Sequence, residues 1–414
     1  MACRLRPKQV QILILPTQIY TQTERLFMAT PSITRIETFE FNVELRNICG
    51  SRHGLGLMYS PGENGIVRRS AMRVETDTGL SGEAAGQLIM ATRQFEMIAH
   101  MVLGRNALHR NELYHDLYFE LRQHDALAIG LLDICLWDLA GKLYESPVYE
   151  LLGSKLRPLP AYASTYHGDR AGGLDSPKAY ADFAVECKEL GFTGFKIHGW
   201  LDGDIPGEIE TILATRDSVG DDMALMIDPA CALPTFADAL RVGQACDEAS
   251  FFWIEDPFPD GGKSFHAHQL LRDKVRTPVL MSEYIRGLHL KTEAAISKST
   301  DLLRVDAYQD GGITGALKLA HVAESLGIDV EIHSHGPAHR HLMTAIRNTN
   351  FYEMNLVHPD AETSGVNIYK NYKEGLDAID PKGNVYAPTE PGLGAEIDWD
   401  YIRSHRVGGT VYEL

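Results

Sequence analysis

Short apolar strands alternate with amphipathic helices along the chain after Pro158, and this alternation constrains the fold more than any other feature. Eight segments have the length and apolar content of strands. Helix-like stretches such as GALKLAHVAESLG (315–327) follow them at intervals of roughly 25 to 30 residues. The eight segments are PAYAST (160–165), GFKIH (194–198), ALMID (224–228), FFWIED (251–256), PVLMSE (278–283), LLRVDA (302–307), IDVEIH (328–333) and FYEMN (351–355). This spacing predicts an α/β fold, a (β/α)7-8 TIM-like barrel over residues 158–358, with its active site at the carboxyl ends of the strands.

An α+β domain is predicted before the barrel, over residues 33–157. The segments ITRIETFEFNVEL (33–45) and VRRSAMRVETDTGLSGEA (67–84) are rich in strand-forming residues, and TDTG (76–79) supplies a turn. From about residue 86 to residue 152 the apolar residues recur at helical spacing. We expect the turn-rich residues 359–414 to return to this first domain, and residues 1–32 to form an N-terminal extension outside the core.

The overall charge excludes two classes of partner. The formal net charge is −17, whereas nucleic acids and anionic membranes are bound by clustered Lys and Arg. A small anionic substrate remains compatible with this charge, because a bound divalent cation reverses the sign of the local field. We therefore expect a small-molecule ligand, with neither a nucleic acid nor a membrane as partner.

The cysteines and the N-terminus predict a cytoplasmic protein. Six cysteines are scattered without a CxxC or CxxxC spacing, so neither a zinc site nor a disulfide framework is indicated. The apolar run VQILIL (10–15) is cut by Pro16 and is too short to span a membrane, and no clean cleavage site follows it.

Polar side chains recur at the ends of the predicted barrel strands. A single acid at such a position is usually a helix cap, but six successive strands that each end in an acid or a histidine favour a shared site. The second strand ends in Lys196 and His198, which point the same way because they are two residues apart. The later strands end in Asp228, Glu255, Glu283, Asp306, His333 and Glu353.

Three of these acids predict a metal site. Asp228, Glu255 and Glu283 come from adjacent strands and supply hard oxygen ligands, which suit Mg²⁺ better than zinc. A site that keeps open coordination positions can take a substrate carboxylate and act as a Lewis acid.

Asp306 and His333 predict a general base. They lie at the ends of neighbouring strands, where the carboxylate can fix the imidazole tautomer and raise its basicity. Such an imidazole accepts a proton near neutral pH.

The chain from about Ile33 to its C-terminus resembles the mandelate racemase-like subgroup of the enolase superfamily. The resemblance rests on VETDTGLSGEAAG, LLDICLWDLAGKLYESPVYELLG, FKIH, MIDP, WIEDP, MSE, RVDAYQDGGITGALKLA, HSHGPAHRHL, YEMN and PGLGAEID, in this order. It implies that the first domain is a capping domain whose loops close over the substrate. It further implies that Mg²⁺ binds the three carboxylates, that Asp306 and His333 are the base dyad, and that Glu353 hydrogen-bonds the substrate carboxylate as it becomes an enolate.

The second strand departs from the subgroup. Its members commonly carry Lys-x-Lys there, with the first lysine neutralising the substrate carboxylate and the second acting as a base. In this chain Lys196 keeps the first position and His198 occupies the second. Lysine-based proton transfer is therefore not expected from this strand.

The resulting hypothesis is an enzyme, a hydro-lyase that dehydrates an aldonic or aldaric sugar acid to a 2-keto-3-deoxy acid. His333 removes the proton next to the carboxylate, and an imidazolium on His333 or His198 protonates the departing 3-hydroxyl. The alternatives are a racemase or epimerase of a 2-hydroxy acid, a cycloisomerase, and a non-catalytic relative that kept the barrel.

The substrate and the assembly are less constrained. In the segment that joins the first two predicted strands, Arg52, His53 and Tyr59 are candidates for binding hydroxyls or a distal carboxylate, as is Tyr166 after the first barrel strand. The resemblance further implies a homo-oligomer, a dimer or an octamer.

Overall fold

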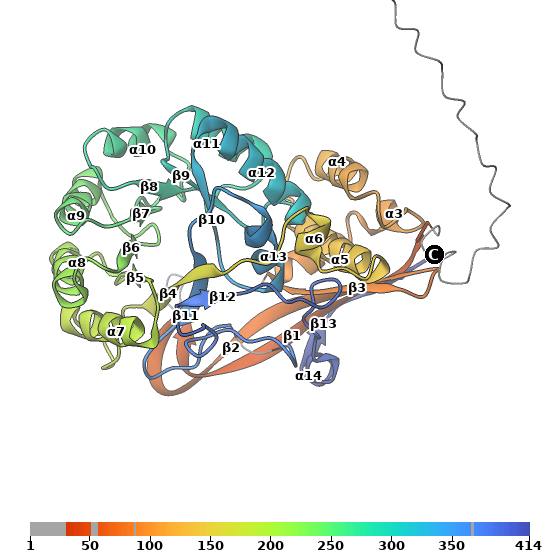
Figure 1. Cartoon of the computed structure of the whole chain (residues 1–414), viewed down its shortest axis with the longest axis horizontal. Helices are drawn as coiled ribbons and strands as arrows, with labels where there is room; N and C mark the ends of the chain where they lie inside the picture. Colours follow the sequence, from red (N-terminus) through yellow and green to blue (C-terminus); the bar gives the residue numbers. More distant parts are fainter. Residues whose placement is uncertain (1–29, 51–56, 87, 366–367) are drawn as a thin grey trace, which may run out of the picture.

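The computed structural model describes residues 30–50, 57–86, 88–365 and 368–414 of the 414-residue chain. Figure 1 shows two parts: parallel strands inside a ring of helices, and long antiparallel strands with helices packed beside them. The predicted extension over residues 1–32 lies almost entirely outside the described residues. Within the described part of the chain, the helices are all too short or too polar to cross a lipid bilayer.

The N-terminal part is an antiparallel sheet with helices. Strand β2 (Leu57–Thr76) pairs with both β1 (Ile33–Gly50) and β3 (Ser81–Gly86), and the turn between β2 and β3 lies where TDTG predicts it. The C-terminal strands β13 (Arg406–Gly408) and β14 (Val411–Glu413), with α14 (Trp399–Ser404) before them, return to pair with β1. The earlier elements are β1 (Ile33–Gly50), β2 (Leu57–Thr76), β3 (Ser81–Gly86), α2 (Ile89–Phe95), α3 (Ala99–Val102), α4 (Arg110–Glu120), α5 (Leu127–Leu143) and α6 (Val148–Leu151).

The second part confirms the predicted barrel and all eight of its strands. Strands β4 to β10 pair in parallel with their neighbours, and β11 returns to pair with β4. The strands are β4 (Leu159–His167), β5 (Gly194–His198), β6 (Ala224–Asp228), β7 (Trp253–Glu255), β8 (Val279–Met281), β9 (Leu302–Val305), β10 (Asp329–Ile332) and β11 (Tyr352–Val357). The helices between them are α7 (Pro177–Leu190), α8 (Ile205–Val219), α9 (Phe236–Glu248), α10 (Phe265–Arg272), α11 (Leu288–Ile296), α12 (Gly312–Leu326) and α13 (Pro337–Ala345). The two-residue strand β12 (Asn384–Val385) pairs with the start of β4.

Side-chain caps begin several helices of the ring. Ser176 accepts a hydrogen bond from the Ala179 amide at the start of α7, and Pro177 occupies the first helical position. Both features suit a helix N-terminus, where the first amides have no partner within the helix. Asp204, Thr235 and Ser264 cap α8, α9 and α10 in the same way.

The interior of the barrel is layered. Tyr162, Met226, Trp253, Leu280 and Leu302 form a buried apolar cluster. Successive inward positions on a strand are two residues apart, so the next inward residues lie one layer closer to the carboxyl ends. On several strands that next residue is polar: Ser164, Asp228, Glu255 and Arg304. The apolar layer therefore closes the barrel beneath a polar one.

Helix α5 of the N-terminal part packs tightly against the segment that follows β9. A Cβ added at Gly130 would lie 2.2 Å from the carbonyl oxygen of Tyr308. Tyr308 is two residues from the predicted dyad member Asp306. A glycine at this position therefore lets the two parts meet at the edge of the site.

The substitution Gly130→Ala should consequently destabilise the fold. We expect the free energy of unfolding to fall by about 1–3 kcal/mol, because the added methyl group collides with backbone atoms. Urea denaturation measures the change. Gly50→Ala is the matched control, since nothing lies within 4 Å of a Cβ added there. Equal stability of the two variants would contradict the close contact.

Candidate active site

Three carboxylates converge at the carboxyl ends of adjacent strands. Asp228 is the last residue of β6, Glu255 is the last residue of β7, and Glu283 follows β8 by two residues. One oxygen from each lies within 4.8 Å of the other two. This set of hard oxygen donors fits Mg²⁺, which binds through a few carboxylates and keeps further positions for water or substrate.

Asp256 fixes the third carboxylate of this triad. Its side chain is buried and accepts hydrogen bonds from the backbone amides of Ser282 and Glu283, at 3.2 and 3.1 Å. The backbone of Asp256 has a φ of +32°, which is unusual for a residue with a side chain. Sequence reasoning missed Asp256, although its place directly after Glu255 in the WIEDP segment is the signal for it.

Two cations lie between the triad and β11. The ammonium of Lys196 lies 2.9 Å from Glu255 and 2.8 Å from Glu353. The guanidinium of Arg304 lies 2.7 Å from each of the same two carboxylates, and its contact with Glu255 is an ion pair without hydrogen-bond geometry. All four side chains are at most 1% exposed. Paired charges at this depth hold one another in place, because an unpaired one would be costly.

Glu353 differs from its expected place on the strand. It is the second residue of β11 and not its end, and it sits deep in the barrel. Burial opposes its charge, but Arg304 and Lys196 outweigh burial and hold the pKa of Glu353 well below its usual range. Its carboxylate also accepts hydrogen bonds from Ser164 and from the Ser334 amide. Glu353 therefore anchors Lys196, and its hydrogen bond to a substrate carboxylate stays a prediction.

His333 and Asp306 are hydrogen-bonded. The Nδ1 atom of His333 lies 2.6 Å from a carboxylate oxygen of Asp306, and its Nε2 atom lies 3.4 Å from Glu283. Burial disfavours the imidazolium, but the Glu283 and Asp306 carboxylates outweigh burial and raise the pKa of His333 to about 9. Asp306 is itself held by the Tyr308 amide. In the tautomer that donates its Nδ1–H to Asp306, the Nε2 atom carries no proton. Nε2 is therefore the atom of His333 that can exchange a proton.

His198 lies at the other end of the triad. Its Nε2 atom is 3.1 Å from Asp228, and its Nδ1 atom is 2.7 Å from the Thr165 carbonyl oxygen, which fixes Nδ1 as a donor. His167 packs edge-on against it at 4.9 Å. Burial, reinforced by the neighbouring His198, lowers the pKa of His167 to about 3, so His167 is neutral.

A cavity of about 410 Å³ joins these groups. The wall includes all but one of the predicted metal and catalytic residues, the exception being the fully buried Glu255. His167, which the sequence suggests as a substrate-binding candidate beside Tyr166, also lines the cavity. Sequence reasoning missed several other lining residues: Arg69, Arg286, Gln309 and Asn355.

The predicted substrate-binding residues are largely elsewhere. Tyr166 is fully buried in an apolar cluster, and its hydroxyl donates to the Glu362 carbonyl at 2.7 Å. Tyr59 lies within strand β2, not in a loop, and stacks on His358. Neither is among the described residues that line the cavity. Arg52 and His53 lie outside the described residues.

The raised pKa of His333 gives a testable expectation. In metal-free protein, NMR titration should give His333 a pKa near 9, and Asp306→Asn should lower it because a hydrogen bond and a charge are lost. The exposed His321 provides an internal reference signal. The ion pairs of His333 should stabilise the metal-free fold fully below about pH 6.5, with that contribution lost as the pH rises through 9. An unchanged titration in Asp306→Asn would contradict the dyad.

Comparison with known proteins gives consistent matches. Residues 179–401 match the family of enolase C-terminal domain-like domains, and residues 67–153 match the N-terminal domain of the mandelate racemase and muconate lactonizing enzyme family. The L-rhamnonate dehydratase of Saccharopolyspora erythraea is 31% identical over 66% of this chain and 66% of its own length. The D-xylonate dehydratase of Haloferax volcanii is 24% identical over 82% of this chain and 85% of its own length. The crystal structure of D-glucarate dehydratase from Agrobacterium tumefaciens complexed with magnesium superimposes with a TM-score of 0.81, at 28% identity, over 92% of this chain and all of that one.

Proposed function

The chain belongs to the mandelate racemase and muconate lactonizing enzyme family of the enolase superfamily, and from this membership we propose that it is a Mg²⁺-dependent dehydratase of sugar acids. Its substrate is an aldonic or aldaric acid and its product a 2-keto-3-deoxy acid. The single observation that carries the proposal is the pair of imidazoles whose Nε2 atoms flank the carboxylate triad, His198 beside Asp228 and His333 beside Glu283. Relatives named as dehydratases of rhamnonate, xylonate and glucarate support it.

Proton removal is the difficult step, because the proton next to a carboxylate is very weakly acidic. Asp228, Glu255 and Glu283 would hold Mg²⁺, which would supply positive charge for the developing enolate and would offset the charge of Glu283, lowering the pKa of His333. His333 then takes the proton at Nε2, while Asp306 holds its Nδ1–H. Lys196, fixed by Glu255 and Glu353, adds a second positive charge that needs no reorganisation.

Loss of water completes the reaction. The electron pair left on C2 forms the C2–C3 double bond as the C3–O bond breaks, and the departing hydroxide takes a proton to leave as water. The imidazolium of His333 or His198 can supply that proton. The enol product then becomes the 2-keto acid by taking a proton at C3 and losing the proton of its C2 hydroxyl.

A screen for turnover tests the proposal. Purified protein with Mg²⁺ is incubated with a stereochemically complete library of aldonic and aldaric acids, and 2-keto products are detected with semicarbazide. We expect keto-acid formation from at least one acid, and none from the same acid when EDTA replaces Mg²⁺. No keto acid from any member of the library would overturn the proposal.

A racemase or epimerase of a 2-hydroxy acid is the second candidate. The same two imidazoles favour it, because they line one cavity from different strands and inversion needs a proton carrier on each face. It predicts deuterium at C2 in D₂O without loss of water. The dehydratase is preferred because a protonated imidazole is suited to expelling a hydroxyl, and because a D-glucarate dehydratase superimposes on this chain with a TM-score of 0.81.

Location and assembly complete the proposal. We place the enzyme in the cytoplasm, since the five described cysteines are all free thiols. Assembly as a homo-oligomer, a dimer or an octamer, stays a prediction.

A further inference from the structure

Three strongly basic side chains line the active-site cavity, and two of them have carboxylate partners. Lys196 pairs with Asp228, Glu255 and Glu353. Arg286 lies 2.6 Å from Asp125 and donates to Gln309. Arg69 forms no ion pair with any carboxylate among the described residues; its one side-chain hydrogen bond there goes to the Ser364 carbonyl oxygen at 3.1 Å. The cavity therefore contains a positive charge that the described protein does not neutralise.

The surroundings of Arg69 make that charge costly. Its side chain is half-buried in the cavity wall, and desolvation lowers the pKa of Arg69 to about 10. A guanidinium has five N–H donors, of which the Ser364 carbonyl takes one. A half-buried cation without a carboxylate partner is stabilised when a ligand supplies the missing anion.

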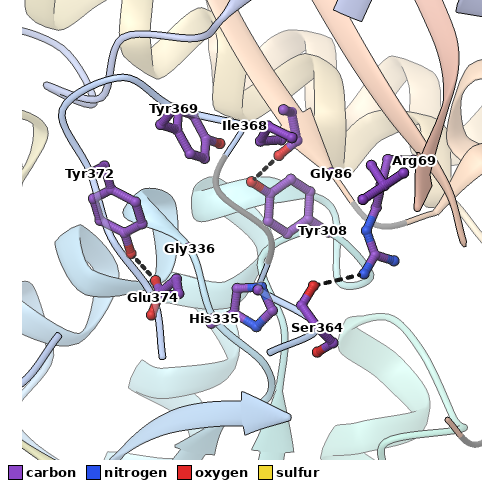
Figure 2. Close-up of a pocket in the computed structure, with 13 residues that line it drawn as sticks. Arg69, Gly86, Tyr308, His335, Gly336, Ser364, Ile368, Tyr369, Tyr372 and Glu374 are labelled. Atoms are coloured by element: carbon purple, nitrogen blue, oxygen red, sulfur yellow. Dashed lines mark hydrogen bonds between the residues drawn. The ribbon is translucent and has the colours of Figure 1, made fainter. Parts of the chain in front are cut away.

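Strand β2 places this side chain in the cavity wall. Val67 and Arg69, two residues apart, both line the cavity, whereas the intervening Arg68 is exposed on the opposite face. Figure 2 shows the Arg69 guanidinium directed at Ser364, with Tyr308 and His335 nearby. A smaller cavity shares Arg69, Tyr308 and Ser364 with the large one, so Arg69 lines both cavities.

We propose that Arg69 binds the second carboxylate of a sugar diacid, which makes the substrate an aldaric acid and not an aldonic one. The inference rests on the proposed function for the reacting end of the substrate, which lies at the triad and Lys196. A planar guanidinium with free donors matches a planar carboxylate in two parallel hydrogen bonds. Both ends of a diacid then meet positive charge, whereas an aldonic acid would leave the Arg69 cation unpaired against a hydroxymethyl group.

Binding and turnover are measured separately to test the inference. Calorimetry with the Mg²⁺-loaded His333→Asn variant, which cannot remove the proton, compares six-carbon aldaric acids with aldonic acids of matched configuration. We expect the preferred diacid to bind about 10–100-fold more tightly than its matched monoacid. Adding Arg69→Met should remove that advantage and change monoacid binding less than about 3-fold. Arg69→Lys should restore part of the preference for the diacid. Arg68→Met is the control, because it removes the same charge from the exposed face of the strand.

The outcomes separate this inference from the proposed function. Equal binding of diacids and monoacids, or equal losses for both in Arg69→Met, overturns the role of Arg69. Tighter binding of a 6-phosphorylated aldonic acid than of every diacid also overturns it. If wild-type protein dehydrates aldonic acids without any preference for diacids, the proposed function stands and this inference fails. If a diacid binds through Arg69 but is never dehydrated, this inference stands and the proposed function fails.

Discussion

The substitution His333→Asn is expected to lower kcat for dehydration by about 10⁴-fold, the upper range for removal of a general base. Asparagine keeps a polar side chain of similar reach but cannot carry the proton. The variant should also lose exchange of the substrate C2 proton with D₂O, because that exchange measures proton removal separately from loss of water. Semicarbazide assays measure product, and proton NMR in D₂O measures exchange.

A parallel variant separates the two imidazoles. His198→Asn should reduce product formation and retain C2 exchange if His198 only protonates the departing hydroxyl. Thermal stabilisation by Mg²⁺ should persist in His333→Asn, which shows that the metal site is intact. Full C2 exchange in His333→Asn would show that another group removes the proton and would contradict the assignment.

Glu255→Gln should have the second large effect, on both metal binding and stability. Glu255 is one of three predicted metal ligands, and it also lies against the two buried cations Lys196 and Arg304. Neutralising it leaves these cations underpaired, which should cost about 3–5 kcal/mol of unfolding free energy. Calorimetry with Mg²⁺ measures affinity, and urea denaturation in EDTA measures stability.

Glu283→Gln is the matched control for this experiment. It removes a predicted metal ligand that lies at the edge of the cavity and, among the described residues, contacts no cation apart from His333. It should lose Mg²⁺ affinity as Glu255→Gln does, and it should lose much less stability in EDTA. Equal stability of Glu255→Gln and wild type in EDTA would contradict the coupling between the metal site and the buried cations.

The sequence predicted the barrel and the convergence of the polar strand ends, for a simple reason. Parallel strands all end at the same side of a barrel, so Asp228, Asp306 and His333 are brought together by topology alone. No side-chain detail was needed for this step. The same argument placed Lys196 and His198 on one face, and the structure has both in the cavity wall.

The substrate-binding residues were harder to predict, because local irregularities decide where a side chain points. Strict alternation from Ser164 would turn Tyr166 inward. The register of β4 against β5 shifts between Ser164 and His167, so Tyr166 packs outward and His167 lines the cavity. Arg304 had a usable signal, since a charged residue two positions before Asp306 in LLRVDA must share its inward face. The sequence contains no comparable signal for Arg69. Whether its charge has a carboxylate partner depends on segments that are distant in the sequence, such as the one that carries Ser364.

Proton NMR of the wild-type protein with Mg²⁺ and an accepted aldaric acid in D₂O tests the central claim most directly. The account predicts that the C2 proton signal disappears as a 2-keto-3-deoxy acid forms with one solvent deuterium at C3. It also predicts that Asp306→Asn and His333→Asn slow both changes together. An unchanged carbon skeleton with deuterium at C2 and no keto acid would contradict dehydration and would instead establish proton transfer between the two faces of the substrate.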